Sequence, residues 1–88
     1  MTSGVAGDPR FSQSLERGLA ILSAFSSSRP LLGVSELARE IGLTRSTTHR
    51  YVATLAAPGY LQQDPVTRRY RLGSRVLGQR RRRAADAI

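Results

Sequence analysis

The spacing of hydrophobic residues changes clearly at Gly59. Before Gly59, apolar residues recur three and four positions apart, which predicts helices. After it, apolar and polar residues alternate over short stretches, which predicts strands. The pattern therefore predicts a mainly α fold with a small β element, of the α+β class, in one domain.

The first helix is expected from Ser12 to Ser28, with Ser12 or Ser14 as its N-cap. Its apolar stripe consists of Leu15, Leu19, Leu22 and Phe25 or Ser26, with Ile21 beside it. We expect this stripe to lie in the core. A second role in contact with another copy of the chain is an equal alternative, because so small a domain is marginally stable alone.

A short helix and a longer one follow, separated by a turn that contains glycine. Leu31–Val34 is expected to form a brief strand, after which Ser35 caps a second helix over Glu36–Ile41. Gly42 ends that helix, since glycine adopts the left-handed conformation without steric cost. The turn Gly42-Leu43-Thr44 then leads into the third helix, and this arrangement is a helix-turn-helix.

The third helix is expected over residues 45–57, with Thr44 as N-cap and Pro58-Gly59 as the stop. Thr48, Tyr51, Val52 and Leu55 form one stripe at helical spacing and should pack inward.

The opposite side of this helix carries small and cationic residues instead of bulky apolar ones. Ser46, Arg50 and Ala53 lie there, flanked by Thr47, His49 and Arg45. Small side chains allow close approach to a DNA groove, hydroxyls bind phosphates or base edges, and Arg pairs two-pronged with guanine. The alternative is an ordinary solvated face, and the helix alone does not distinguish the two.

After the third helix, Tyr60–Gln63 and Arg69–Leu72 are the strand candidates, joined by a turn that begins at Asp64-Pro65. In the second strand, Arg69 and Arg71 share one face, which points to solvent or to phosphate. A basic hairpin after a helix-turn-helix is the wing of a winged helix, although a solvated hairpin is equally compatible with either arginine alone.

The net charge of +8 lies entirely in the second half of the chain. Residues 1–43 hold four Arg and four acidic residues, whereas residues 44–88 hold ten Arg against two Asp. This one-sided charge favours a polyanionic partner. Ser74 is expected to start a linker helix, and Arg80–Arg83 is either a phosphate-contacting tail or a solvated segment.

Other classes of function are disfavoured by what the sequence lacks. It contains no cysteine and only one histidine, His49, without a second metal ligand at helical spacing, so we expect no metal, no cofactor and no enzymatic activity. Apolar runs are too short to span a membrane and no signal peptide is evident, so a cytoplasmic protein is expected.

Four segments carry a resemblance to a known family: SLERGLAIL from Ser14, VSELAREIGLTRSTTHRYVATL from Val34, GYLQQD from Gly59 and RYRLGSRVL from Arg69. Together they resemble the N-terminal DNA-binding domain of the IclR family of bacterial transcription regulators. The resemblance implies a winged helix-turn-helix that binds operator double-stranded DNA as a homodimer. It also implies a set of DNA-contacting residues, carried over by position: Thr44, Arg45, Ser46, Thr47 and Arg50, with support from Arg69 and Arg71 in the wing. Independently of the resemblance, His49 on the same helix is expected to be a groove-edge or surface residue, and we include it among the candidate DNA contacts.

This chain departs from the family pattern in three places. Arg68 stands where the wing turn usually has glycine, and Pro58 stands where a helix-compatible residue is usual. The third departure is that family members continue into an effector-binding domain, whereas this sequence ends at Ile88. We therefore expect either a fragment or a truncated regulator, with no small-molecule site in these residues.

The expected organisation is a mobile arm over 1–11, the winged helix-turn-helix over 12–73, and a linker helix with an arginine-rich tail over 74–88. The predicted function is regulation of transcription through sequence-specific binding to duplex DNA. The alternative is a winged-helix module that binds RNA or a protein, since the fold alone does not determine the ligand.

Overall fold

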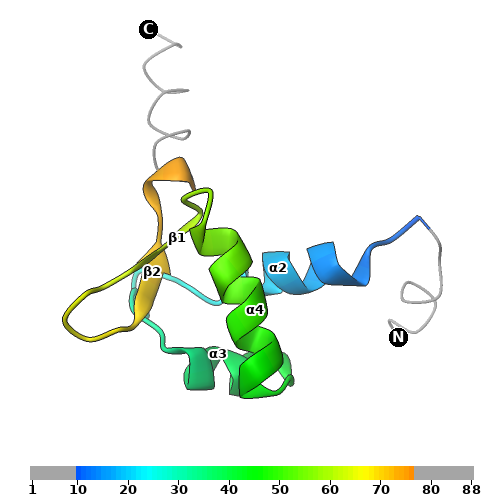
Figure 1. The fold of residues 1–88 in the computed structure, drawn as a ribbon, viewed down its shortest axis with the longest axis horizontal. Helices are drawn as coiled ribbons and strands as arrows, with labels where there is room; N and C mark the ends of the chain where they lie inside the picture. The colour runs from blue at the N-terminus through cyan, green and yellow to red at the C-terminus, as the bar shows by residue number, and fades with distance from the viewer. Residues whose placement is uncertain (1–9, 77–88) are drawn as a thin grey trace, which may run out of the picture.

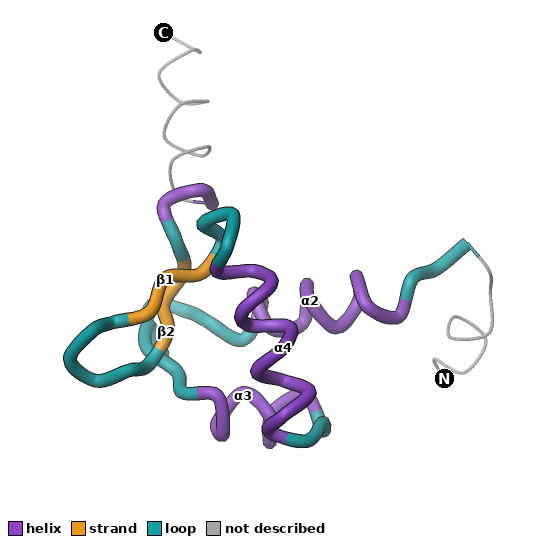
Figure 2. Tube along the Cα trace, viewed as in Figure 1, coloured by secondary structure: helices purple, strands orange, loops and turns teal. Residues whose placement is uncertain are grey.

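The structure is a computed structural model that describes residues 10–76. Within these residues, three helices and a two-stranded antiparallel sheet make up the fold. Helix α4 stands at the centre of Figure 1, with α3 across its lower end and the hairpin to its left. It contacts α2, α3 and β1. Figure 2 shows the same elements coloured by type. Their bounds are α2 Gln13–Ser23, α3 Val34–Ile41, α4 Arg45–Ala56, β1 Leu61–Gln63 and β2 Tyr70–Leu72.

The core lies where the three helices meet the sheet. Ile21, Leu37, Val52 and Leu61 are at most 1% exposed, and they come from α2, α3, α4 and β1 in that order. One side chain from each of these four elements therefore meets in a single buried cluster, which holds the three helices and the sheet together.

Helix α2 begins as predicted, because Ser12 accepts a hydrogen bond from the Leu15 N–H at 3.2 Å. It ends at Ser23, five residues before the predicted end, where Ala24 forms the C-cap. A tight turn then pairs Ser26 with Arg29 through two backbone hydrogen bonds of 3.2 and 3.1 Å. These backbone bonds replace helical ones, so the helix does not continue.

The prediction that Leu15 and Leu19 pack in the core is wrong. Their side chains are 63% and 55% exposed, whereas Gly18, Ile21 and Phe25 are buried. The helix has two adjacent apolar stripes, and the sequence spacing suits both. The side that carries Gly18 and Ile21 is the one that packs into the core, whereas Leu15 and Leu19 lie at the margin of the contact with α4 and remain on the surface.

Helix α3 starts two residues earlier than predicted. Its N-cap is Gly33 and not Ser35, and the Glu36 carboxylate accepts a hydrogen bond from the Gly33 N–H at 2.7 Å. The predicted strand over Leu31–Val34 is correspondingly reduced to one bridge, in which Leu32 and Tyr70 exchange backbone hydrogen bonds of 2.9 and 2.8 Å.

The turn and the third helix confirm the sequence prediction. Gly42 is left-handed, with a φ of 75°, and Thr44 caps α4 by accepting from the Thr47 N–H at 3.1 Å. Helix α4 ends at Ala56, one residue short of the predicted end, with Ala57 as C-cap. Thr48 and Val52 are buried, and Tyr51 and Leu55 are half-buried, so the predicted inner stripe is confirmed.

The hairpin is confirmed, with each strand one residue shorter than predicted. Leu61 pairs with Leu72, and Gln63 pairs with Tyr70. Arg68 in the connecting turn has a φ of 67°, a conformation that glycine adopts more readily. At its base the hairpin passes so close to the end of α4 that a Cβ on Gly73 would lie 2.1 Å from the Gly59 carbonyl oxygen.

Residues Ser74–Val76 begin a further helical turn, in agreement with the predicted start of a linker helix. The remainder of the predicted linker helix, the predicted Arg80–Arg83 tail and most of the predicted N-terminal arm lie outside the described residues.

Candidate nucleic-acid interface

The outward side of α4 presents the residues that the sequence places there. Ser46, His49, Arg50 and Ala53 are exposed, and Thr47 is half-buried. Since Thr48 and Val52 on the reverse side are fully buried, the rotation of the helix about its axis is fixed. The exposed strip therefore keeps a defined orientation relative to the rest of the fold.

Arg45, in the first turn of α4, is held by the preceding helix. Its Nε donates to the Ser35 hydroxyl at 3.0 Å, and the residue as a whole is exposed. This hydrogen bond links the two helices of the helix-turn-helix at their outer surface. It also restricts the Arg45 side chain before any ligand arrives.

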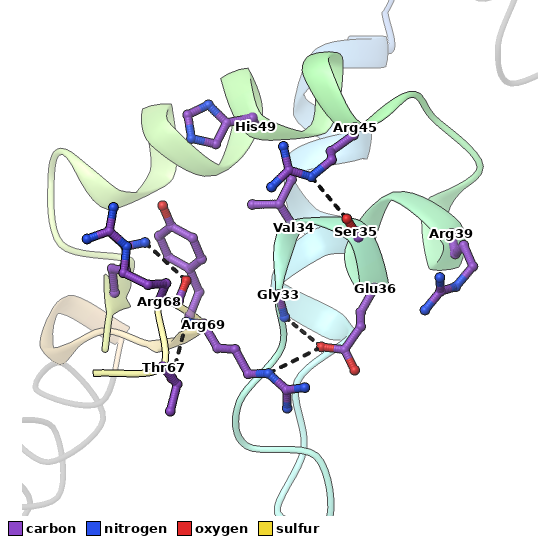
Figure 3. A pocket seen from close by; sticks show the side chains of 12 residues that line it. Gly33, Val34, Ser35, Glu36, Arg39, Arg45, His49, Thr67, Arg68 and Arg69 are labelled. Carbon is purple, nitrogen blue, oxygen red and sulfur yellow. Dashed lines mark hydrogen bonds and ion pairs between the residues drawn. The ribbon is translucent and has the colours of Figure 1, made fainter. Parts of the chain in front are cut away.

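An open hollow of about 580 Å³ lies between α4 and the hairpin, and we call it the wing hollow. Figure 3 shows Arg45 and His49 projecting from α4 on one side of it and Arg68 and Arg69 on the hairpin side. Its lining consists of Gly33, Val34, Ser35, Glu36, Arg39, Arg45, His49, Gln63, Thr67, Arg68, Arg69 and Tyr70. Cations thus line both walls of a space that borders the exposed strip of α4.

Glu36 is the one carboxylate that lines the wing hollow. Its hydrogen bond from the Gly33 N–H lowers the pKa of the carboxyl group, and the nearby Arg69 lowers it further. Arg69 Nε lies 3.9 Å from Glu36 Oε1 in a loose, half-exposed ion pair. Glu36 therefore stays ionised at neutral pH as a helix cap, while Arg69 retains freedom to leave it.

The hairpin turn is organised by Asp64. This carboxylate accepts hydrogen bonds from the Thr67 N–H at 2.7 Å and from the Thr67 hydroxyl at 2.9 Å, and from Arg71 at 2.8 Å. The Thr67 N–H is the main cause that lowers the pKa of Asp64. Arg71, predicted as a DNA contact, is therefore already engaged within the hairpin.

Arg68 occupies the wing turn with a different set of contacts. Its backbone carbonyl accepts from Gln63 Nε2 at 3.0 Å, which holds the left-handed backbone in place. Within residues 10–76 its guanidinium makes neither a hydrogen bond nor an ion pair. The turn therefore exposes one arginine whose side chain is uncommitted.

Comparison with known proteins identifies the architecture. Residues 14–65, more than half of the chain, match the model of the IclR helix-turn-helix domain. This chain belongs to the IclR family. Among curated relatives, it is 48% identical over 65 residues to the HTH-type transcriptional regulator TsaQ1/TsaQ2 of Comamonas testosteroni. The aligned segment covers 74% of this chain and 23% of the relative.

Two further IclR-family comparisons agree. The glycerol operon regulatory protein of Streptomyces griseus is 38% identical over 65 residues, which covers 74% of this chain and 26% of that protein. The crystal structure of an IclR family transcriptional regulator from Brucella abortus superposes with a TM-score of 0.78 at 32% identity, over 92% of this chain and 31% of that one. This chain spans about a quarter of the length of these curated relatives.

Of the residues predicted to contact DNA, the structure places Thr44, Arg45, Ser46, Thr47, His49 and Arg50 together at the N-terminal end of α4, and it places Arg69 across the wing hollow. Arg71 lies apart, against Asp64. Arg68 also lines the wing hollow and was not among the residues expected to contact DNA. The available signal was its position at the tip of the hairpin, where the family usually has glycine.

No group of three or more His, Cys, Asp or Glu side chains in the described part of the chain could hold a metal ion. None of the helices within residues 10–76 has the length and hydrophobicity needed to cross a lipid bilayer.

Proposed function

We propose that this chain binds double-stranded operator DNA sequence-specifically and regulates transcription. Helix α4 enters the major groove with Ser46 and Arg50 towards the base edges. The hairpin lies along the adjacent backbone. The observation that carries the proposal is the composition of the exposed side of α4, where hydroxyl and guanidinium groups replace bulky apolar side chains on a helix of fixed rotation.

Physical chemistry supports this assignment of roles. Small residues such as Ser46 and Ala53 allow the helix backbone to approach the floor of the groove. Arg50 is exposed and long enough to pair two-pronged with a guanine, and it forms no ion pair within the described part of the chain. Thr44 and Thr47, at the start of the helix, suit phosphate contacts that set the register.

The wing contributes through Arg68 and Arg69 in this proposal, and Arg71 holds the hairpin in shape. Arg69 can exchange its loose contact with Glu36 for a phosphate, because a pair 3.9 Å apart and half-exposed is weak. Arg68, at the tip, reaches the backbone or the minor groove, where a cation is favoured by the negative potential of a narrow groove.

The names of the relatives support the regulatory part. The matched proteins of Comamonas testosteroni and Streptomyces griseus are named as a transcriptional regulator and an operon regulatory protein. This chain spans only about a quarter of their length, so we infer by analogy, as part of the proposal, that it also regulates a gene.

We also propose that a second copy of the chain covers the exposed leucines of α2. Leu15 and Leu19 border a hollow of about 400 Å³ that also involves Leu22 and Leu55, and we call these four residues the leucine face. A two-fold pair of such domains reads two half-sites, so the operator would be a pseudo-palindrome.

Selection from a random pool of duplex DNA, with the full 88-residue chain as bait, tests the proposal. We expect a two-fold symmetric motif to be enriched. If six to ten phosphates are neutralised, affinity for that motif should fall by about 10³–10⁵ between 50 and 200 mM salt. Enrichment of no motif, or a flat response to salt, would refute the proposal. The proposal would also be refuted if the chain bound duplex RNA in preference to duplex DNA when the two compete.

Replacing Arg50 with Ala tests its assigned role within that assay. We expect a loss of about 1–3 kcal/mol and relaxed preference at one base position. Arg29→Ala is the matched control, because Arg29 is an exposed arginine that pairs with Glu40 away from the exposed strip of α4. An equal loss across all DNA sequences would instead make Arg50 a phosphate contact.

A further inference from the structure

A second cationic hollow lies on the side of α4 that faces α2. Its volume is about 240 Å³. Six residues line it: Ser14 and Arg17 from α2, and Thr47, Arg50, Tyr51 and Thr54 from α4. The helices cross here, so residues at least 30 positions apart in the sequence share one small surface depression.

The lining has an unusual chemical composition. It contains two guanidinium groups, four hydroxyl groups and no carboxylate. The wing hollow, in contrast, includes Glu36 among its arginines. Phosphate oxygens accept hydrogen bonds from both hydroxyl and guanidinium groups, and the guanidinium adds a positive charge. The lining therefore suits a phosphate group.

The groups in this hollow are linked to one another but not to an anion. The Tyr51 and Ser14 hydroxyls are hydrogen-bonded at 3.4 Å. Hydrogen bonds to Ser14 and to Arg17 lower the pKa of the Tyr51 phenol. Neither Arg17 nor Arg50 forms an ion pair with a carboxylate inside the described region. Two like charges thus face a common space that an anionic ligand would fill.

The position of this hollow relative to α4 suggests which anion. The wing hollow borders one long edge of the exposed strip, through Arg45 and His49, and this hollow borders the other, through Thr47 and Arg50. A helix seated in a major groove has a phosphodiester backbone along each of its two edges. Each hollow therefore lies on the side of α4 where the backbone of one DNA strand would run.

We infer that Ser14, Arg17 and Tyr51 form a binding site for one backbone phosphate of the DNA strand on the α2 side of the recognition helix. The inference rests on the proposed function and extends it, because it gives α2 a DNA contact that neither the sequence pattern nor the family resemblance assigned. Arg17 supplies the charge, and the Tyr51 and Ser14 hydroxyls orient the phosphate. The contact sets register and affinity without reading a base.

The test combines protein variants with DNA in which single phosphates are replaced by uncharged methylphosphonates. The duplex is the one enriched in the selection above, and each position of each strand is substituted in turn. We expect one phosphate per half-site whose replacement weakens wild-type binding about tenfold. The same replacement should have no effect on Arg17→Gln, which itself binds the unmodified duplex about tenfold more weakly.

Three controls separate a phosphate contact from a structural role. Arg17→Gln should lower the slope of log affinity against log salt by about 1, and it should leave the selected motif unchanged. Tyr51→Phe keeps the packed ring and should show a smaller loss at the same phosphate. Arg29→Gln, an arginine paired with Glu40, should behave as wild type.

The outcomes are distinguishable from failure of the proposed function. If the wild-type chain selects no motif, the function is wrong. If it selects a motif but every methylphosphonate weakens Arg17→Gln as much as wild type, this inference alone is overturned. A lower melting temperature for Arg17→Gln with an unchanged salt slope also overturns it, because Arg17 would then only support Tyr51.

Discussion

The Arg71 guanidinium reaches along the hairpin to the Asp64 carboxylate, where its terminal nitrogen lies 2.8 Å from Oδ1. The other carboxylate oxygen of Asp64 accepts the two hydrogen bonds from Thr67. One side chain thus joins the start of the turn to its end and to the second strand. The shape of the wing depends on Asp64 being ionised.

This dependence predicts an effect of pH on stability. The folded state lowers the pKa of Asp64 below its ordinary 3.8, chiefly through the Thr67 N–H. The carboxylate therefore contributes its stabilisation in full above pH 3.8 and loses it as the pH falls through the lower, folded-state pKa. Melting temperature should fall on acidification, and Asp64→Asn should flatten part of that fall.

Glu36, whose pKa is also lowered by a backbone N–H, contributes to the same fall, so Asp64→Asn/Glu36→Gln should flatten the acid limb further. Thermal melts between about pH 6 and 2.5 measure this. Glu16→Gln on α2 is a control outside both contacts. An acid limb of unchanged steepness in the double variant would show that neither carboxylate governs it.

Arg68 allows a prediction in which stability and binding change in opposite directions. A left-handed residue with a Cβ is strained by about 1–2 kcal/mol, and Arg68 has a φ of 67°. Arg68→Gly removes that strain but adds backbone freedom to the unfolded chain, so the net gain should be about 0.5–1 kcal/mol. DNA affinity should nevertheless fall, because the cation at the wing tip is lost.

Chemical denaturation and DNA-binding anisotropy measure the two quantities. Arg68→Asn is the matched variant, since asparagine tolerates the left-handed conformation but carries no charge. It should bind DNA as weakly as Arg68→Gly. If both variants bind as tightly as wild type, Arg68 has no part in the interface.

The elements whose sequence signals are local were predicted closely. Thr44, Gly42 and Pro58-Gly59 act on their own neighbours, so the bounds of α4 could be predicted to within one residue. Buried Thr48 and Val52 then fix its exposed side, because a helix with one buried stripe has only one outward face.

The errors arose where one local pattern fits two packings. Helix α2 has two apolar stripes, and only the crossing with α3 and α4 decides that Ile21 is buried and Leu19 exposed. Ser35 is a good cap by type, but Glu36 reaches back to Gly33 and starts α3 earlier. The pairing of Arg71 with Asp64 and the meeting of Arg17 with Tyr51 depend on tertiary geometry, which spacing does not encode.

Thr48 carries a buried polar atom that finds no partner. Its side chain is 0% exposed, and its hydroxyl makes no hydrogen bond within the described residues. Leaving a hydroxyl unsatisfied in the core costs about 1–3 kcal/mol. Thr48→Val preserves the branched shape, so the free energy of unfolding should rise by about 1 kcal/mol while DNA binding stays unchanged.

Denaturant titration measures that gain, and Thr54→Val is the control on the same helix. The Thr54 hydroxyl already donates to the Arg50 carbonyl at 2.8 Å and is exposed, so its removal should bring no gain. A loss of stability in Thr48→Val would mean that the hydroxyl is satisfied in solution by ordered water.

The leucine face leads to the prediction on self-association. Leu15 and Leu19 lie one helical turn apart and are more than half exposed, although Leu22 and Leu55 beside them are partly buried. In a single domain this arrangement leaves apolar surface in water, and burying it against a second copy is favourable by about 25 cal/mol per Å². Leu15→Gln/Leu19→Gln should therefore weaken dimerisation at least tenfold without unfolding the domain.

Sedimentation velocity measures the association, and binding to isolated and paired half-sites measures its consequence. Leu15 and Leu19 line neither cationic hollow, although the hollow that they border shares Ser14, Tyr51 and Thr54 with the one on the α2 side of α4. Affinity for one half-site should therefore be unchanged in the leucine variant, while the advantage of the paired site is lost. Val66→Gln is the control, since Val66 is 86% exposed on the wing turn, away from the leucine face. Should the double leucine variant dimerise like wild type, the two-fold contact must be made by another surface, and the leucines would then be ordinary exposed residues.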